Sequence, residues 1–335
     1  MGSFMTQRSL FEDAEGVDPA PVDDAVRCLG DALPGRIHLG TSSWSFPGWT
    51  GLVYAPCNGK PATEQALARH GLAAYARHPL FRTVSLDRTF YGPLSADEFA
   101  RYASQVPDGF RFVVKAPAAV TDPVVRKPGS GEATRDNPTF LDAAAATAAF
   151  VRPALAGLET NAAGAARAGP LVFQFPPLGR RFVADAPRLA ARIAAFVAVL
   201  PRGPLYAVEV RDPELVTPAL SAALADAGAV PCLAVHARMP PVEQQARAFG
   251  LDRGGHPLVA RWNLHAGRDY EGAKADYFPF NRLVEEDLPS RTALASLARA
   301  TAAAGRDVFI TINNKAEGSA PQSVARLAAA IVDRA

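Results

Sequence analysis

Five charged residues stand at or near the ends of apolar runs, and together they could do chemistry. They are Asp87, Lys115, Glu209, Arg211 and Arg261. A carboxylate such as Glu209 or Asp87 suits a general base, and Lys115 suits an electrophile or a Schiff-base amine. Arg211 or Arg261 suits a clamp for an anionic group. The set predicts acid–base or lysine chemistry on a small molecule.

The charge balance of these five side chains indicates a kind of ligand. Three are cations and two are carboxylates, which favours an anionic or strongly polar ligand. A desolvated lysine that faces other cations has the lowered pKa that a reactive amine needs. We therefore predict Asp87, Lys115 and Glu209 as catalytic residues, and the two arginines as ligand-binding residues.

Further polar and aromatic residues lie close to the same run ends. Side chains alternate between the two faces of a strand, and an outward charge would press unpaired against a helix layer. Gln174 lies on the opposite face from Phe173 and Phe175, so its direction is ambiguous. For any one residue, a hydrogen-bonded core group or a buried ion pair is an equally good interpretation. The other predicted ligand-binding residues are Thr41, Ser42, Trp44, Tyr91, Gln174, His236, Asn263, Asn313 and Asn314.

Eight short β-like runs position these residues, and each finishes on polar or charged side chains. Helical segments separate the runs, and this alternation predicts a parallel sheet, because parallel neighbours need a crossover connection. The runs span residues 37–41, 83–87, 111–115, 171–175, 206–211, 231–236, 258–263 and 308–313.

The number of strand–helix units predicts the fold class. Eight units over about 300 residues favour a single α/β barrel, the (β/α)8 TIM type, over an open doubly wound sheet. The turn after the first run, Gly40-Thr41-Ser42-Ser43, lacks the G-x-G-x-x-G pattern of dinucleotide binding. Barrel enzymes place their working groups at the carboxyl ends of the strands. The predicted helices span residues 63–77, 95–104, 138–158, 182–200, 213–227, 242–248, 282–304 and 321–334.

Two segments depart from this alternation. Residues 1–34 are acidic and rich in Asp, Ala and Pro, and they predict a loosely packed extension with a short helix near 22–29, before a barrel domain at 35–335. The connection at 118–137 is non-periodic, and a connection of this length is either a lid or disordered.

Ser319 is a candidate cap for a last helix that begins near Pro321. Free amides there would also suit a phosphate, although an ordinary cap is the favoured interpretation.

Composition limits the partners and the compartment. The chain has 335 residues, is 49% hydrophobic and carries a formal net charge of +2, which gives no bulk argument for a nucleic-acid or membrane partner. Cys28, Cys57 and Cys232 are odd in number and widely spaced, so no disulfide framework or thiolate zinc site is indicated and a reducing cytoplasm fits. We also find no apolar run of the length of a membrane span and no secretory signal.

Six short motifs follow one another from about Ile37 to the C-terminus. They are Gly40-Thr41-Ser42-Ser43-Trp44-Ser45 with Trp49, Gly51, Tyr54 and Pro56; Thr89-Phe90-Tyr91; Val114-Lys115-Ala116-Pro117; Phe173-Gln174-Phe175-Pro176-Pro177; Val208-Glu209-Val210-Arg211; and Asn313-Asn314 with Gly318 and Ala320-Pro321. Together they resemble the YecE-like family, the domain of unknown function numbered seventy-two. The resemblance implies a TIM-type barrel, mostly bacterial and archaeal, with no established activity. It supports the fold and leaves the reaction open.

The chain departs from the pattern of that family at two places. Where the family usually reads Val-Glu-Ile-Asn, residues 84–87 read Val-Ser-Leu-Asp, so Ser85 replaces an inward carboxylate and Asp87 replaces an amide. After the seventh strand Arg261 is kept, whereas the histidine is displaced to His265. Either the carboxylate role has moved to Asp87, or this member has altered or lost the chemistry of the family.

A non-catalytic barrel is the main alternative class of function. Such a protein would bind single-stranded nucleic acid or a protein partner without turnover. Basic residues in the connection at 118–137, together with Trp44, Trp49 and Tyr91, would offer cations and stacking surfaces to nucleic acid. Rim packing is the more common role of such aromatic residues.

Metal-dependent and glycosidase chemistry are less favoured. A metal-dependent nuclease or isomerase needs several converging ligands, and only His236 and His265 are histidines near strand ends. Glycoside hydrolysis by Asp87 and Glu209 is disfavoured because the two carboxylates lie three strands apart. We therefore predict no metal site and no cofactor.

Overall fold

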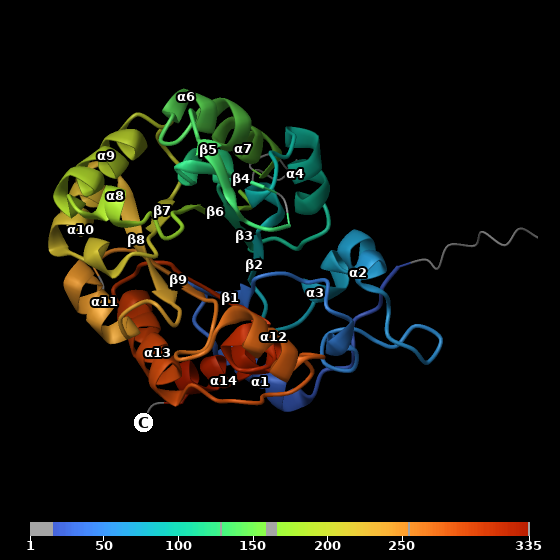
Figure 1. Cartoon of the computed structure of the whole chain (residues 1–335). Coiled ribbons are helices and arrows are strands. Elements are labelled where there is room, and N and C mark those ends of the chain that lie inside the picture. Colours follow the sequence, from blue (N-terminus) through green and yellow to red (C-terminus); the bar gives the residue numbers. More distant parts are fainter. Residues whose placement is uncertain (1–15, 128, 159–165, 254, 334–335) are drawn as a thin grey trace, which may run out of the picture.

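The eight predicted parallel strands close into a barrel in the computed structural model, which describes residues 16–127, 129–158, 166–253 and 255–333. The strands pair in the order β1-β10-β9-β8-β7-β6-β3-β2, and β1 pairs with both β10 and β2. Figure 1 shows the helices as a ring around this barrel. The predicted (β/α)8 TIM-type fold is confirmed. The strands are β1 (Ile37–Thr41), β2 (Thr83–Leu86), β3 (Arg111–Lys115), β6 (Ala168–Gln174), β7 (Tyr206–Glu209), β8 (Ala229–Val235), β9 (Leu258–Trp262) and β10 (Val308–Ile312).

Six strands end slightly earlier than the sequence predicts, and for five of them this changes where a candidate site residue lies. Asp87, Arg211, His236, Asn263 and Asn313 stand in the loops that follow β2, β7, β8, β9 and β10. The strands themselves are buried on both faces, as expected for a parallel sheet covered by helices. Polar side chains are therefore concentrated on the loops at the carboxyl ends of the strands.

Every predicted helical segment contains at least one helix, including the short segment at 242–248, which is α11. The segment at 138–158 is interrupted by a π-helical turn at Thr147–Val151, and residue 334 of the last segment lies outside the described residues. The short helices α5, α8 and α12 were not expected. The helices are α1 (Asp24–Ala32), α2 (Glu64–His70), α3 (Leu72–Tyr75), α4 (Ala96–Ala103), α5 (Ala118–Thr121), α6 (Ala143–Ala146), α7 (Arg152–Leu158), α8 (Arg180–Val183), α9 (Ala186–Ala198), α10 (Pro218–Asp226), α11 (Val242–Phe249), α12 (Tyr270–Tyr277), α13 (Leu288–Ala303) and α14 (Ala320–Val332).

Apolar side chains pack on both sides of the barrel wall. Residues such as Phe112, Phe173 and Val208 face outward into the large core that the strands share with the helices. Alternate residues of the strands face inward and form a separate apolar cluster, as the two-residue period of a strand requires. This inner layer fills the barrel interior, so polar groups are left to its ends. It consists of Val113, Val172, Ala207, Val230, Cys232, Val259 and Phe309.

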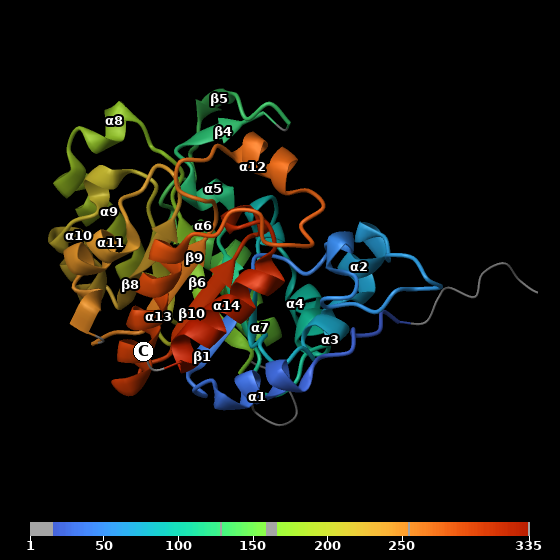
Figure 2. The ribbon, with the colours of Figure 1, turned by 90° about the horizontal axis from the view of Figure 1, so that it is seen from below.

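The connection at 118–137, expected to be a lid or disordered, carries an ordered hairpin. After α5, β4 (Val124–Arg126) pairs antiparallel with β5 (Ala133–Asp136), and residue 128 lies outside the described residues. Asn137 Nδ2 ties the base of the hairpin together by donating to the carbonyls of Ala119 (2.8 Å) and Asp122 (2.7 Å). Figure 2 shows the hairpin and α12 at one end of the barrel and α1 at the other.

The N-terminal extension, expected to be loosely packed over residues 1–34, is fixed at its C-terminal part. Helix α1 overlaps the predicted helix at 22–29, and Arg82 holds the turn after it. The Arg82 guanidinium donates to the carbonyls of Gly30 (2.8 Å), Leu33 (3.0 Å) and Pro34 (2.7 Å). Residues 1–15 lie outside the described residues.

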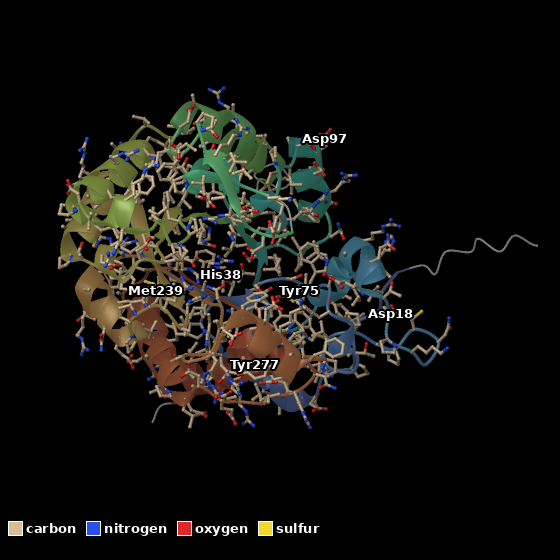
Figure 3. The ribbon with its side chains drawn as sticks, in the orientation of Figure 1. Asp18, His38, Tyr75, Asp97, Met239 and Tyr277 are labelled. Carbon is tan, nitrogen blue, oxygen red and sulfur yellow. The ribbon has the colours of Figure 1, made fainter. Side chains whose placement is uncertain are left out.

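Two histidines are packed against phenylalanine rings in the core. His38 stacks on Phe309 with 4.7 Å between ring centroids, and His78 stacks on Phe81 at 4.1 Å. Burial lowers the pKa of each to about 4. Both rings are therefore neutral in the folded protein at pH 7. Figure 3 labels His38 within the ring of helices.

We expect the free energy of unfolding to fall as the pH is lowered from about 6.5 to about 4. An unfolded histidine titrates near pH 6.5. Between about pH 6.5 and 4 the unfolded chain therefore binds protons that the folded chain excludes, and above about pH 6.5 the two buried histidines no longer reduce the stability. His38→Phe keeps the ring stack and should remove about 1 to 3 kcal/mol of this pH dependence. Urea denaturation at several pH values measures it. The exposed His256→Gln serves as the control, and an equal change in both variants would contradict the assignment.

Candidate functional site

A fully buried carboxylate, Glu209, lies between two arginines at the end of β7. Its Oε1 accepts a hydrogen bond from Arg211 Nε (2.6 Å) and pairs with Arg211 Nη2, and its Oε2 accepts from Arg261 Nη1 (2.9 Å). Burial alone would raise the pKa of Glu209, but the two guanidinium groups overcome it and lower the pKa to about 2. Both oxygens are occupied, so the geometry favours a positioning role for Glu209 over the general-base role.

The second carboxylate, Asp87, is more accessible. Arg261 Nη2 donates to both of its oxygens, at 3.0 and 2.8 Å, and Ser85 Oγ donates to Oδ1 at 2.6 Å. The side chain of Asp87 is 34% exposed, whereas that of Glu209 is fully buried. Asp87 therefore places a carboxylate against Arg261 from the very position where the family pattern has an amide. Asp87 is the better candidate for a proton acceptor.

Lys115 ends β3 beside this ion-pair network. Its Nζ lies 3.6 Å from the centroid of the Phe90 ring, and within the described ranges it makes no hydrogen bond or ion pair. Burial lowers the pKa of Lys115 to about 8; the nearby carboxylates oppose this shift and the nearby arginines add to it. The lowered pKa means that a larger fraction of the amine is neutral near pH 7 than for an exposed lysine.

A cavity of about 380 Å³ opens beside Arg211 at the barrel mouth. It is lined by side chains that include Gln174, Arg211, His236 and Arg238. The direction of Gln174, left ambiguous by the sequence, is thus toward the mouth. Burial, together with Arg211, lowers the pKa of His236 to about 4. Its Nδ1 accepts from the backbone N–H of Arg238 (3.3 Å), so the neutral ring carries its proton on Nε2.

A larger cavity, about 720 Å³, lies away from the mouth. Its described lining includes Asp18, Cys57 and His70 but neither an arginine nor a lysine. The charged side chains that converge are those at the mouth, so the mouth is the candidate site despite its smaller volume.

Lys315 and Tyr270 belong to the mouth, although sequence reasoning did not choose them. Tyr270 lines the cavity, and Lys315 Nζ lies 4.3 Å from the centroid of its ring. Burial lowers the pKa of Lys315 to about 8, and Lys274 adds to the shift. Lys315 stands directly after the Asn-Asn motif. The contact of Lys315 with Tyr270 depends on α12, and the sequence of α12 has no apolar periodicity that would have predicted a helix there.

Thr41 and Trp44, predicted as ligand-binding residues, point away from the mouth. Thr41 Oγ1 donates to the carbonyl of Ser43 (2.6 Å) and lies 2.8 Å from the hydroxyl of Tyr75, a residue of the helix layer labelled in Figure 3. Trp44 is 8% exposed and donates through Nε1 to the carbonyl of Leu67 (3.1 Å). Thr41 shares the outward face of β1 with the apolar core, so its predicted inward direction is wrong.

Three polar residues do lie at the mouth but are engaged with neighbouring loops. Asn313 Nδ2 donates to Ser42 Oγ (2.8 Å), and its Oδ1 accepts from the backbone N–H of Lys315 (3.0 Å). Asn263 Nδ2 donates to the carbonyl of Arg261 (3.1 Å). The Asn313–Ser42 bond ties the loop after β10 to the loop after β1, whereas the Asn263 bond stays within its own segment. Tyr91, another predicted ligand-binding residue, is 88% exposed.

Asn314, also predicted to bind ligand, is a buried structural residue. Its Oδ1 accepts hydrogen bonds from Trp49 Nε1 (3.2 Å) and from the backbone N–H of Ala320 (2.9 Å). The Asn314 side chain therefore pairs with the backbone N–H of the first residue of α14. Ser319 makes no side-chain capping bond. The expected Ser319 cap is replaced by this longer-range contact.

The described residues contain no group of three or more His, Cys, Asp or Glu side chains arranged to hold a metal ion. None of their helices is both long and apolar enough to cross a membrane.

A closed parallel barrel whose charged residues meet at the carboxyl ends of its strands places this chain in the class of TIM-barrel proteins. Within that class, the family model described as "Protein of unknown function DUF72" matches residues 38–335, and the chain belongs to this family.

Solved structures agree with the fold. A DUF72 family protein from Enterococcus faecalis V583 matches with a TM-score of 0.59 and 17% identity, covering 89% of this chain and 96% of that one. A DUF72 family protein from Thermotoga maritima MSB8 matches with a TM-score of 0.54 and 17% identity, covering 87% and 96%. None of the curated proteins compared with the chain matches it. At this identity the likeness concerns the fold alone.

We expect Glu209→Gln to destabilise the fold strongly. The substitution leaves Arg211 and Arg261 without their buried counter-charge, and breaking a buried ion pair from one side costs about 3 to 5 kcal/mol. Chemical denaturation measures the loss. The control is Asp136→Asn, which breaks an exposed pair with Arg181 and should cost less than about 0.5 kcal/mol. Similar losses in the two variants would show that Glu209 does not organise the mouth.

Proposed function

We propose that the barrel mouth binds a small anionic ligand through Arg211. The observation that carries this proposal is the arrangement of the Arg211 guanidinium, which lines the cavity while Glu209 holds its Nε and Nη2. Arg211 Nη1 makes no hydrogen bond or ion pair within the described part of the chain. A guanidinium held on one edge and open on the other is prepared for a carboxylate or a phosphate.

The surrounding charges support an anion over a cation. Arg238 lines the same cavity, and the charges of Arg211 and Arg261 both act on Lys115 nearby. Both Glu209 oxygens are already taken by arginines, so that carboxylate repels an incoming anion less than an unpaired one would. Neutral His236 offers an N–H donor without a charge of its own. The volume of about 380 Å³ suits a small molecule.

Lysine chemistry is the reaction that this geometry supports best. In the neutral form, the Lys115 amine would add to a carbonyl carbon of the bound anion. Its two protons would pass in turn to the carbonyl oxygen, which would leave as water as the carbon–nitrogen double bond of the imine forms. Asp87 is the accessible carboxylate beside it and would carry the proton. Arg211 would hold the anionic group during these steps.

Nucleic acid is a less favoured occupant than a small anion. Trp44 and Trp49 are buried and hydrogen-bonded within the fold, so of the three proposed stacking rings only Tyr91 is exposed.

The three cysteines are free thiols, which fits the reducing cytoplasm that we expect for this chain.

Substitution of Arg211 tests anion binding. We expect acetate and inorganic phosphate to shift the nuclear magnetic resonance signals of the mouth, and Arg211→Gln to weaken the binding of both at least about ten-fold because the charge-assisted contact is lost. His236→Asn should weaken binding without breaking the Glu209 ion pair. The exposed Arg181→Gln is the matched control. Unchanged affinity in Arg211→Gln would overturn the proposal.

Reductive trapping tests the amine. We expect pyruvate with cyanoborohydride to leave a covalent adduct on Lys115, with a yield that rises as the pH approaches about 8 because the neutral fraction of the amine increases. Peptide mapping by mass spectrometry locates the adduct. Lys115→Arg should abolish it, whereas Lys315→Arg should retain it. Absence of an adduct across a panel of anionic aldehydes and ketones would refute the reaction.

A further inference from the structure

We propose that the ligand of this site carries a planar ring beside its anionic group, and that Tyr270 is the surface on which the ring stacks. This inference rests on the proposed anion site at Arg211 and names the chemical class of its ligand. The observation behind it is that Tyr270 and Arg211 line the same cavity, from α12 and from the loop after β7. A single small molecule in that cavity would meet both.

Tyr270 is exposed but is held in place. Its residue is 55% exposed, and it is the first residue of α12. Asp269, the residue before it, caps the helix by accepting from the backbone N–H of Gly272 at 2.8 Å. The ring stands at the edge of a cavity that is also lined by charged side chains.

Lys315 explains how the ring is held. Its ammonium lies 4.3 Å from the ring centroid, the residue is 7% exposed, and within the described residues Nζ makes no hydrogen bond or ion pair. Removing an ammonium from water is costly, and the negative face of the ring is the compensation that the structure provides. Lys315 thus covers one face of Tyr270, and the residue is still 55% exposed.

The covering cation also favours a particular partner for the exposed part of Tyr270. It draws electron density through the ring, and offset stacking with a second planar ring is then the favoured contact. A second exposed ring, Tyr91, lies close enough to Tyr270 to influence its pKa. Asp269 lines the cavity near Tyr270 and disfavours a second negative group at that end. The ligand class is therefore a planar ring with one anionic group at its far end.

Two sources share this chemistry, an aromatic carboxylate and a nucleoside monophosphate. Paired probes separate them and isolate the ring. Benzoate and cyclohexanecarboxylate have the same charge and similar size, but only benzoate is planar. Adenosine 5′-monophosphate and ribose 5-phosphate differ by the base. We expect the planar member of at least one pair to bind at least about five-fold more tightly in nuclear magnetic resonance titrations, as stacking contacts allow.

Variants of Tyr270 assign the effect to its ring. Tyr270→Phe should keep the preference for the planar probe, and Tyr270→Leu should abolish it while leaving the non-planar probe unchanged. Phe278→Ala is the control, because Phe278 is 73% exposed directly after α12 and does not line the cavity. Lys315→Gln should reduce the preference, since the covering charge is lost.

The outcomes separate this inference from the proposed function. Equal binding of both members in each pair, weakened by Arg211→Gln, would overturn the stacking surface and keep the anion site. A planar preference that survives in Tyr270→Leu would likewise overturn it. Failure of all four probes to bind in an Arg211-dependent way would overturn the anion site and this inference together.

Discussion

The carboxylate of Glu209, fully buried and shared between two guanidinium groups, is the constraint on which the mouth of this barrel depends. Three charges taken out of water are tolerable only when each is paired. The pairing fixes Arg261 toward Asp87 and Arg211 toward the cavity. One buried negative charge therefore determines the direction of both arginines, and through them the positive charge that lines the cavity.

The same constraint separates groups that are occupied from groups that can react. Glu209 has no oxygen left to accept a proton. Lys115, in contrast, rests on the Phe90 ring with a lowered pKa, and Asp87 remains partly accessible beside it. The departure of this chain from the family pattern at residues 85 and 87 has a structural counterpart, because Ser85 donates to the Asp87 carboxylate that Arg261 binds. The hydroxyl and the acid thus work as a pair within one network.

The strand order, the barrel closure and most helices follow from the sequence pattern, because alternating β-like and helical runs admit few topologies. The convergence of Asp87, Lys115, Glu209, Arg211 and Arg261 was also predictable, since all lie at or near the carboxyl ends of strands. The predicted side-chain direction was wrong at Thr41, which shares its outward face of β1 with Ile37 and Leu39. Trp44 and Asn314 were misassigned because a buried hydrogen bond to a distant loop leaves no local signal. Tyr270 and Lys315 were missed because α12 lacks an apolar repeat, and their contact exists only in three dimensions.

The inner apolar layer around Cys232 has a consequence for how such a protein can diversify. Because this layer fills the barrel interior, the space open to any small molecule at the mouth is bounded by the rim loops and by the charged side chains beneath them. Changes in the rim loops can then alter what is bound while the folding determinants stay intact. Selection for a new ligand and selection for a stable barrel act on largely separate sets of residues, so such a scaffold can acquire new specificities at little risk to its folding.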